Sequence, residues 1–76
     1  MKKFNPESEN VVDYLRSLNN FEVNSDLDEL MSTDNLEKRM DLCDSIITTL
    51  QFQFGDDSNE DWFLEMEEEL KDIVMS

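Results

Sequence analysis

The side chains of this sequence that could do chemistry are almost all carboxylates. Its 76 residues include 20 aspartates and glutamates, one cysteine and no histidine. Nucleophilic catalysis needs a base beside a serine or cysteine, and histidine, the usual base, is missing. Carboxylate pairs act as acid and base only where burial separates their pKa values, whereas these acids follow the solvent faces of predicted helices. We therefore expect no enzyme activity and no cofactor.

One stretch comes close to the calcium-binding loop of an EF-hand. Residues with side-chain oxygens occupy the first, third, fifth, ninth and twelfth places of that loop: Asp57, Asn59, Asp61, Glu65 and Glu68. The sixth place needs glycine for a sharp turn, and here it is Trp62, which would be strained in that conformation. A helix that carries the same acids on its outer face needs no strain, so we predict no metal site.

Negative charge increases along the chain, and the net charge is −14. Residues 1–24 carry four acids and three bases, residues 25–50 seven and two, and residues 51–76 nine and one. The net charges of the three segments are therefore −1, −5 and −8. Within the last two segments the acids recur at helical spacing, in one row of Asp61, Glu65, Glu68 and Asp72 with Asp57 before it, and in another of Glu37, Asp41 and Asp44.

These two rows indicate a surface that binds a cationic partner. Acids three or four residues apart lie about 5–6 Å apart on one face of a helix and repel each other. Few bases relieve this repulsion here, and a cationic partner would neutralise it. Leu64, beside the first row, adds an exposed apolar anchor. The predicted partner-binding residues are Asp57, Asp61, Leu64, Glu65, Glu68, Asp72, Glu37, Asp41 and Asp44.

Four helical segments are predicted to position these acids. The first runs from Pro6 to about Leu18, a short second one covers residues 25–31, the third begins at Leu36, and Ser58 caps the last. The third has the a/d spacing of a coiled-coil-like seam, formed by Leu36, Met40, Cys43, Ile47, Leu50 and Phe54. Strand-forming residues leave open whether the stretch 46–54 is helical or ends in an extended segment near 50–54. We expect a mainly α fold: a single domain of residues 1–76, with three longer helices and one short helix.

Several partners and locations are excluded by composition. The six lysines and arginines are scattered and form no phosphate-binding stripe, so we expect no direct binding to nucleic acid. No apolar run approaches about 18 residues, and nothing resembles a signal peptide, so we expect no membrane association. Cys43 is alone and falls on the apolar seam, which favours a buried structural thiol and a cytoplasmic location.

In size, acidity and helix-borne carboxylate rows, the chain resembles the small DNA-mimic proteins that phages and mobile elements direct against host factors. This resemblance rests on the charge pattern of the two rows. It implies an inhibitor in the bacterial host cytoplasm that occupies the basic nucleic-acid site of a nucleoid-associated protein, an RNA polymerase, or a restriction or CRISPR effector. Two other functions fit the same features. One is an antitoxin or immunity protein that neutralises a basic toxin, and the other is an adaptor that forms a homodimer through the seam.

Overall fold

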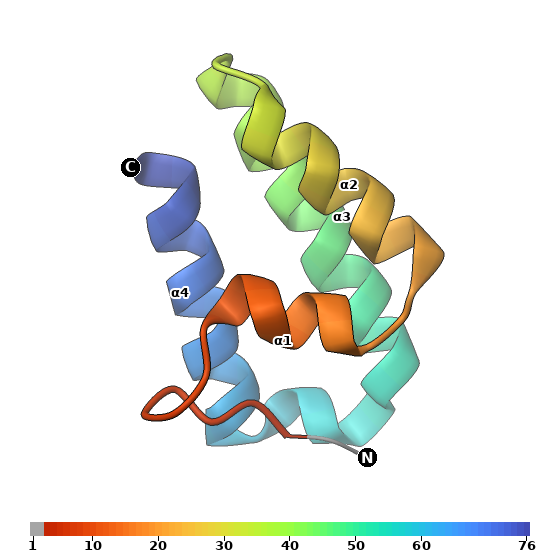
Figure 1. The fold of residues 1–76 in the computed structure, drawn as a ribbon. Helices are drawn as coiled ribbons and strands as arrows, with labels where there is room; N and C mark the ends of the chain where they lie inside the picture. The colour runs from red at the N-terminus through yellow and green to blue at the C-terminus, as the bar shows by residue number, and fades with distance from the viewer. Residues whose placement is uncertain (1–2) are drawn as a thin grey trace.

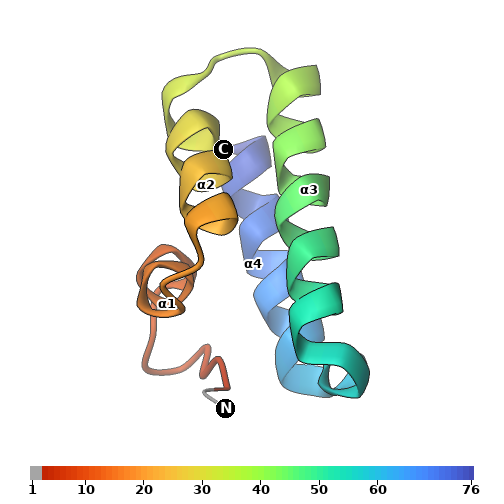
Figure 2. The same ribbon diagram turned by 90° about the vertical axis from the view of Figure 1, so that its right-hand side faces the viewer.

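Four α-helices and one short 3-10 helix account for most of residues 3–76, the part of the chain that the computed structural model describes. They are α1 (Val11–Ser17), α2 (Phe21–Ser32), α3 (Leu36–Phe54), η1 (Gly55–Asn59) and α4 (Asp61–Met75). Helix α3 packs against both α2 and α4, and α1 lies across α2 and α4 near one end (Figures 1 and 2). The expected mainly α fold with three longer helices and one short helix is confirmed, although the short helix is α1.

Asparagine side chains start three of the four helices. Asn10, Asn20 and Asn35 each accept a hydrogen bond from a backbone N–H two or three residues further on. This N-cap geometry satisfies one of the unpaired amides of the first helical turn. The cap at Asn20 explains why α2 begins at Phe21, whereas the sequence predicted a shorter helix over residues 25–31.

The start of the first helix was predicted too early. Asn5 forms a turn, in which its side chain accepts the N–H of Glu7 at 3.1 Å, and the helix starts only at Val11. This turn accompanies the burial of Phe4, whose ring lies 5.2 Å from that of Tyr14. A helix through residues 7–9 would contribute only polar side chains, which offer no apolar face to stabilise so short a helix.

Helix α3 remains helical through the stretch whose strand propensity left its structure open. Ile46, Ile47, Leu50 and Phe54 are all buried on one face, so packing against the neighbouring helices outweighs the local β preference. The helix ends at Gly55, where the backbone turns with a φ of 59° that side-chain-bearing residues rarely adopt.

Helix α4 begins at Asp61 and not at the predicted cap. Ser58 lies in η1, where its hydroxyl donates to the carbonyl of Gly55 at 2.8 Å. From Asp61 onwards the predicted phase of the helix is confirmed, because Phe63 and Met66 are buried. The aromatic rings at this end of the core contact one another edge-on or tilted; they belong to Phe4, Tyr14, Phe54, Trp62 and Phe63.

At the end of the molecule away from these aromatic rings, Arg39 connects two segments through hydrogen bonds. The Arg39 guanidinium donates to the carbonyls of Thr33 at 3.0 Å, Ile73 at 2.7 Å and Val74 at 3.3 Å. The last turn of α4 contains no base of its own. Arg39 therefore pairs the Val74 carbonyl, shares the Ile73 carbonyl with Ser76, complements the helix dipole there, and ties α4 to the loop between α2 and α3.

Candidate functional site

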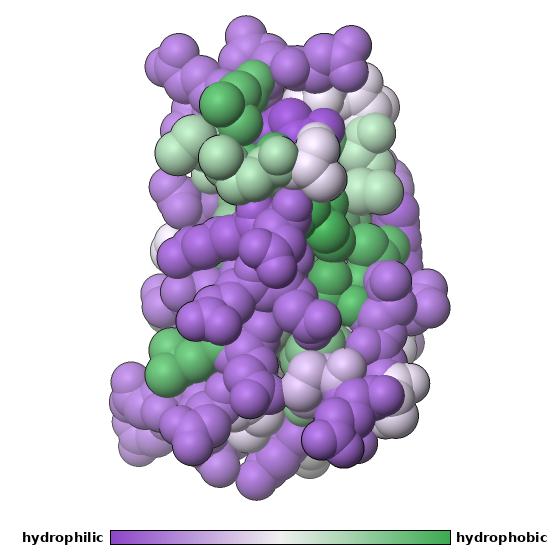
Figure 3. Space-filling view, turned by 90° about the vertical axis from the view of Figure 1, so that its left-hand side faces the viewer, coloured by the Kyte–Doolittle hydropathy of each residue, from purple (hydrophilic) through white to green (hydrophobic). Residues whose placement is uncertain are grey.

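The four acids predicted to form a row on the last helix lie on the outward face of α4. Asp61, Glu65, Glu68 and Asp72 are exposed, and the apolar residues of the opposite face are buried. At 1.5 Å per residue the row is roughly 16 Å long, which gives about one carboxylate every 5.5 Å. The side of the molecule formed by α4 is accordingly hydrophilic over most of its area (Figure 3).

The other predicted site residues lie on η1, α4 and α3. Asp57 is half-buried in η1, and Leu64 on α4 is 50% exposed. The second predicted row is exposed on α3 and consists of Glu37, Asp41 and Asp44. Asp44 borders α4, because it lines a groove together with Lys71. The structure thus places eight of the nine predicted residues on the surface: seven acids in two rows on neighbouring helices, and Leu64 beside the row on α4.

Every base between residues 3 and 76 is engaged by another group of the chain. The ion pairs are Lys3–Glu60, Arg16–Asp28, Lys38–Glu29 and Lys71–Glu67, while Arg39 binds backbone carbonyls. None of the four carboxylates in these pairs belongs to the predicted site. Lys71, the one base on α4, binds Glu67 one turn earlier at 3.3 Å. The bases of the described residues therefore leave the carboxylates of the predicted site unneutralised.

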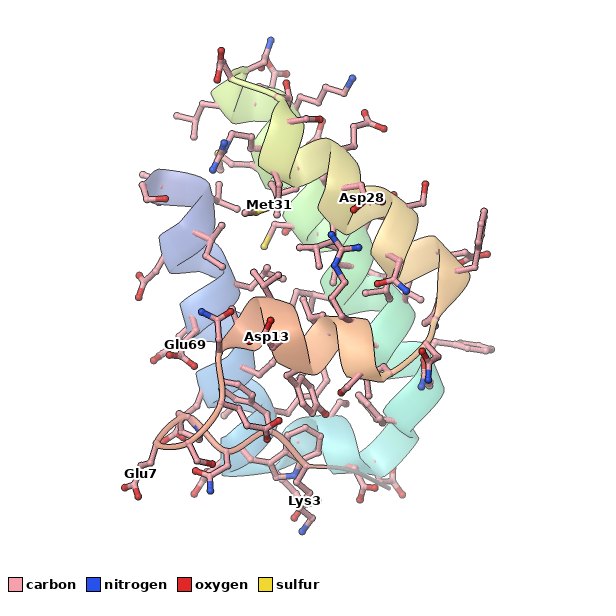
Figure 4. The ribbon with its side chains drawn as sticks, in the orientation of Figure 1. Lys3, Glu7, Asp13, Asp28, Met31 and Glu69 are labelled. Atoms are coloured by element: carbon pink, nitrogen blue, oxygen red, sulfur yellow. The ribbon has the colours of Figure 1, made fainter. Side chains whose placement is uncertain are left out.

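A hollow beside α1 extends the acidic surface in a way that the sequence did not reveal. It has a volume of about 410 Å³, and its acidic lining consists of Glu7, Glu9, Glu69 and Asp72. One carboxylate oxygen of Glu69 is buried there without a hydrogen-bond partner. Glu69 on α4 lines this hollow together with Asn10 and Val11 at the start of α1, and Glu7 lies in the turn below (Figure 4). The row on α4 thus continues at Asp72 into the N-terminal turn, although these acids are more than 60 residues apart in sequence.

The residues of the EF-hand-like stretch do not form a loop. Asp61, Glu65 and Glu68 stand on a continuous helix and point outwards with its turns. Within residues 3–76, no group of three or more acidic or cysteine side chains converges closely enough to hold a metal ion. Three of the four carboxylates that resemble a calcium loop in sequence are therefore members of the exposed row, and the fourth, Asp57, lies in η1.

The thiol of Cys43 is buried, as its place on the seam predicted. Burial raises its pKa, and the negative charge of Asp44 raises it further. A thiol that stays protonated is a poor nucleophile. By contrast, the pKa of Glu60 is lowered, chiefly because the Lys3 ammonium donates a hydrogen bond to its carboxylate.

The seam of α3 is only partly buried, which corrects the prediction. Leu36 and Met40 remain 49% and 51% exposed, whereas the seam from Cys43 onwards is buried by the chain itself. These two residues belong to the first turns of α3, which extend past Met75 at the end of α4 (Figure 1). The groove between the two helices is lined here by Met40, Cys43, Asp44, Lys71, Val74 and Met75, and its volume is about 190 Å³.

Three further observations bear on the site as a whole. Leu64, Met75 and Met40 leave apolar surface near the acids, so the site is not purely polar. None of the helices described between residues 3 and 76 has both the length and the apolarity needed to cross a bilayer. Comparison of the chain with protein-family models, with curated proteins and with solved structures found no match.

Proposed function

We propose that this chain is an acidic inhibitor that mimics the charge of DNA and occupies the basic nucleic-acid-binding site of another protein. The observation that carries the proposal is the exposed row Asp61, Glu65, Glu68 and Asp72, which the ion pairs of the described chain leave without a base. One strand of duplex DNA carries a charge about every 3.4 Å of axis. The row carries one about every 5.5 Å on a rigid helix. Lysines and arginines arranged to bind phosphates would be attracted to both.

The energetics of the free chain support a cationic partner. Each pair of like charges three or four residues apart destabilises a helix by about 0.2–0.5 kcal/mol. The row contains three such successive pairs, and Lys71, which could relieve them, is bound to Glu67. Bases of a partner would remove this repulsion on binding and would also accelerate association. We therefore expect the affinity to fall steeply as salt rises, because exposed charges are screened over about 10 Å at 0.1 M salt.

The two other functions require different parts of the molecular surface. An adaptor that dimerised through the seam of α3 would need residues that are buried inside the chain, among them Ile47, Leu50 and Phe54. Only Leu36 and Met40 of that seam are open to a partner. An antitoxin or immunity protein would use the same acidic surface as a DNA mimic. The two differ in whether DNA competes for the partner.

The proposal is tested by capturing partners on the immobilised chain from a bacterial lysate at low salt, and then eluting them with duplex DNA. A nucleic-acid-binding protein should be retained and should be released by DNA. Retention of a basic protein that DNA cannot release would instead favour the antitoxin. Retention of no nucleic-acid-binding protein would refute the mimic.

Two matched variants map the surface in the same assay. Glu65→Gln with Glu68→Gln removes two charges from the row, and Asp13→Asn with Glu22→Gln removes two exposed charges from α1 and α2. We expect the first pair to weaken binding about tenfold, which corresponds to about 1.4 kcal/mol. The second pair should change it less than about threefold, because its charges lie outside the row. Equal effects would contradict the assignment of the row.

A further inference from the structure

The end of the molecule where α4 stops carries an apolar groove that the acidic rows do not explain. Its open side is formed by Met40 and Met75, which are 51% and 69% exposed, and its floor by Cys43 and Val74. Leu36, one turn before Met40 on α3, continues the apolar surface beyond the groove. In the space-filling view, apolar surface gathers at this end of the α4 side, surrounded by hydrophilic surface (Figure 3).

The size and the side chains of the groove suit one or two apolar side chains of a partner. Its volume of about 190 Å³ exceeds the roughly 150 Å³ of a cavity that accommodates benzene. Methionine side chains are flexible and polarisable, so Met40 and Met75 can repack around differently shaped groups. Exposed methionines of this kind recur at surfaces that bind amphipathic helices.

One acid lines the groove on the α3 side, and further acids lie beside it on both helices. On α3, Asp44 lines the groove directly, and Glu37 lies one turn from Met40. On α4, Asp72 is three residues from Met75 and therefore neighbours it on the helix surface. Lys71 is the one base in the lining, and its ammonium is bound to Glu67. An apolar floor with Asp44 at its edge and further acids beside it is complementary to an apolar side chain flanked by lysines or arginines.

We propose that the groove between α3 and α4 receives an amphipathic helix with basic flanks from the protein that this chain inhibits. This inference rests on the proposed function and names the element of the partner that is recognised. A second copy of the chain fits the groove poorly, because it would bring the acids beside the groove and net charges of −14 against each other. The acids attract the helix, and the groove holds one of its apolar side chains.

The test uses the whole chain with methyl-labelled methionines and two synthetic peptides of identical leucine and lysine composition. One peptide has its leucines at helical spacing, and the other has them scrambled so that no apolar face forms. The amphipathic peptide should shift the NMR signals of the Met40 and Met75 methyl groups, while Met66, buried in the core, stays unchanged. The scrambled peptide should bind about tenfold more weakly and leave both signals in place. Equal binding of the two peptides, or unmoved signals from both groove methionines, would overturn the proposal.

A pair of variants distinguishes binding in the groove from nonspecific binding to exposed apolar side chains. Met40→Ser with Met75→Ser should weaken the amphipathic peptide about tenfold, whereas Phe52→Ser, which alters a 93% exposed side chain elsewhere on α3, should not. Circular dichroism checks that both remain folded. If Met40 and Met75 signals broaden with protein concentration in the absence of peptide, the occupant is a second copy and the proposal fails. If the groove variant binds the captured partner normally while the Glu65 and Glu68 variant does not, only the groove assignment falls.

Discussion

The contacts of Arg39 predict that this one residue supplies a large part of the stability of the fold. Its guanidinium joins the final turn of α4 to the loop between α2 and α3 through three carbonyl oxygens. Arg39→Met removes these bonds but keeps a long side chain with a similar helix propensity. The Val74 carbonyl then loses its Arg39 donor, the Ile73 carbonyl keeps only its bonds from Ser76, and the last turn of α4, which has no base of its own, loses the guanidinium that complements its dipole.

The size of the effect follows from the geometry. A hydrogen bond to a charged group contributes about 1.5–3 kcal/mol net. Because Arg39 is half-buried, water replaces part of what is lost, and we expect about 2–4 kcal/mol for all three bonds together. A chain of this length has a total stability of about 4–11 kcal/mol. At a urea slope near about 1 kcal/mol per molar, the midpoint should fall by about 2 M or more.

The neighbouring residue provides the control. Lys38→Met changes the net charge by the same amount in the same helix, but it removes only the exposed pair of Lys38 with Glu29. Exposed pairs contribute about 0–1 kcal/mol, so this variant should lie close to the unaltered chain in urea unfolding followed by circular dichroism. Arg39→Lys should be intermediate, because an ammonium keeps the charge but cannot reach three carbonyls in the same fork. If the free energies of unfolding of Arg39→Met and Lys38→Met differ by less than about 0.5 kcal/mol, the three hydrogen bonds of Arg39 do not stabilise the fold.

Three other properties follow from single residues. Gly55→Ala should lower the free energy of unfolding in urea by about 1–3 kcal/mol, because only its positive φ opposes a side chain and no atom lies within 4 Å of an added Cβ. D-alanine at the same position of a synthetic chain should not lower it. Equal losses for the two would contradict this. Burial, followed by the charge of Glu9, raises the pKa of Tyr14 to about 12, from 10.0 in the unfolded chain. The unfolded chain releases this proton first, so stability should fall as pH rises from about 10 to 12, and less steeply in Tyr14→Phe. Cys43 should react with iodoacetamide far more slowly in the folded chain than in urea, and similar rates would show that its burial does not protect it.

The parts of the fold that could be predicted are those where the apolar period is continuous. Phe63, Met66 and Leu70 recur at three and four residues, and this spacing alone gives the buried face of α4. Helix starts could not be predicted as well, because several asparagines compete for the same role. Asn5 and Asn10 are both plausible caps, and the choice between them depends on tertiary contacts such as the burial of Phe4 against the core.

The same limit applied to the site. The acidic rows could be predicted, because the outer face of a helix is fixed once its apolar face is known. The groove could not, since it depends on where one helix ends beside another. Leu36 and Met40 continue the seam of α3 without interruption in sequence, yet they are half-exposed while the seam from Cys43 onwards is buried. One apolar seam therefore forms the core along most of its length and leaves its first turns open, beside the acids that would attract a basic partner.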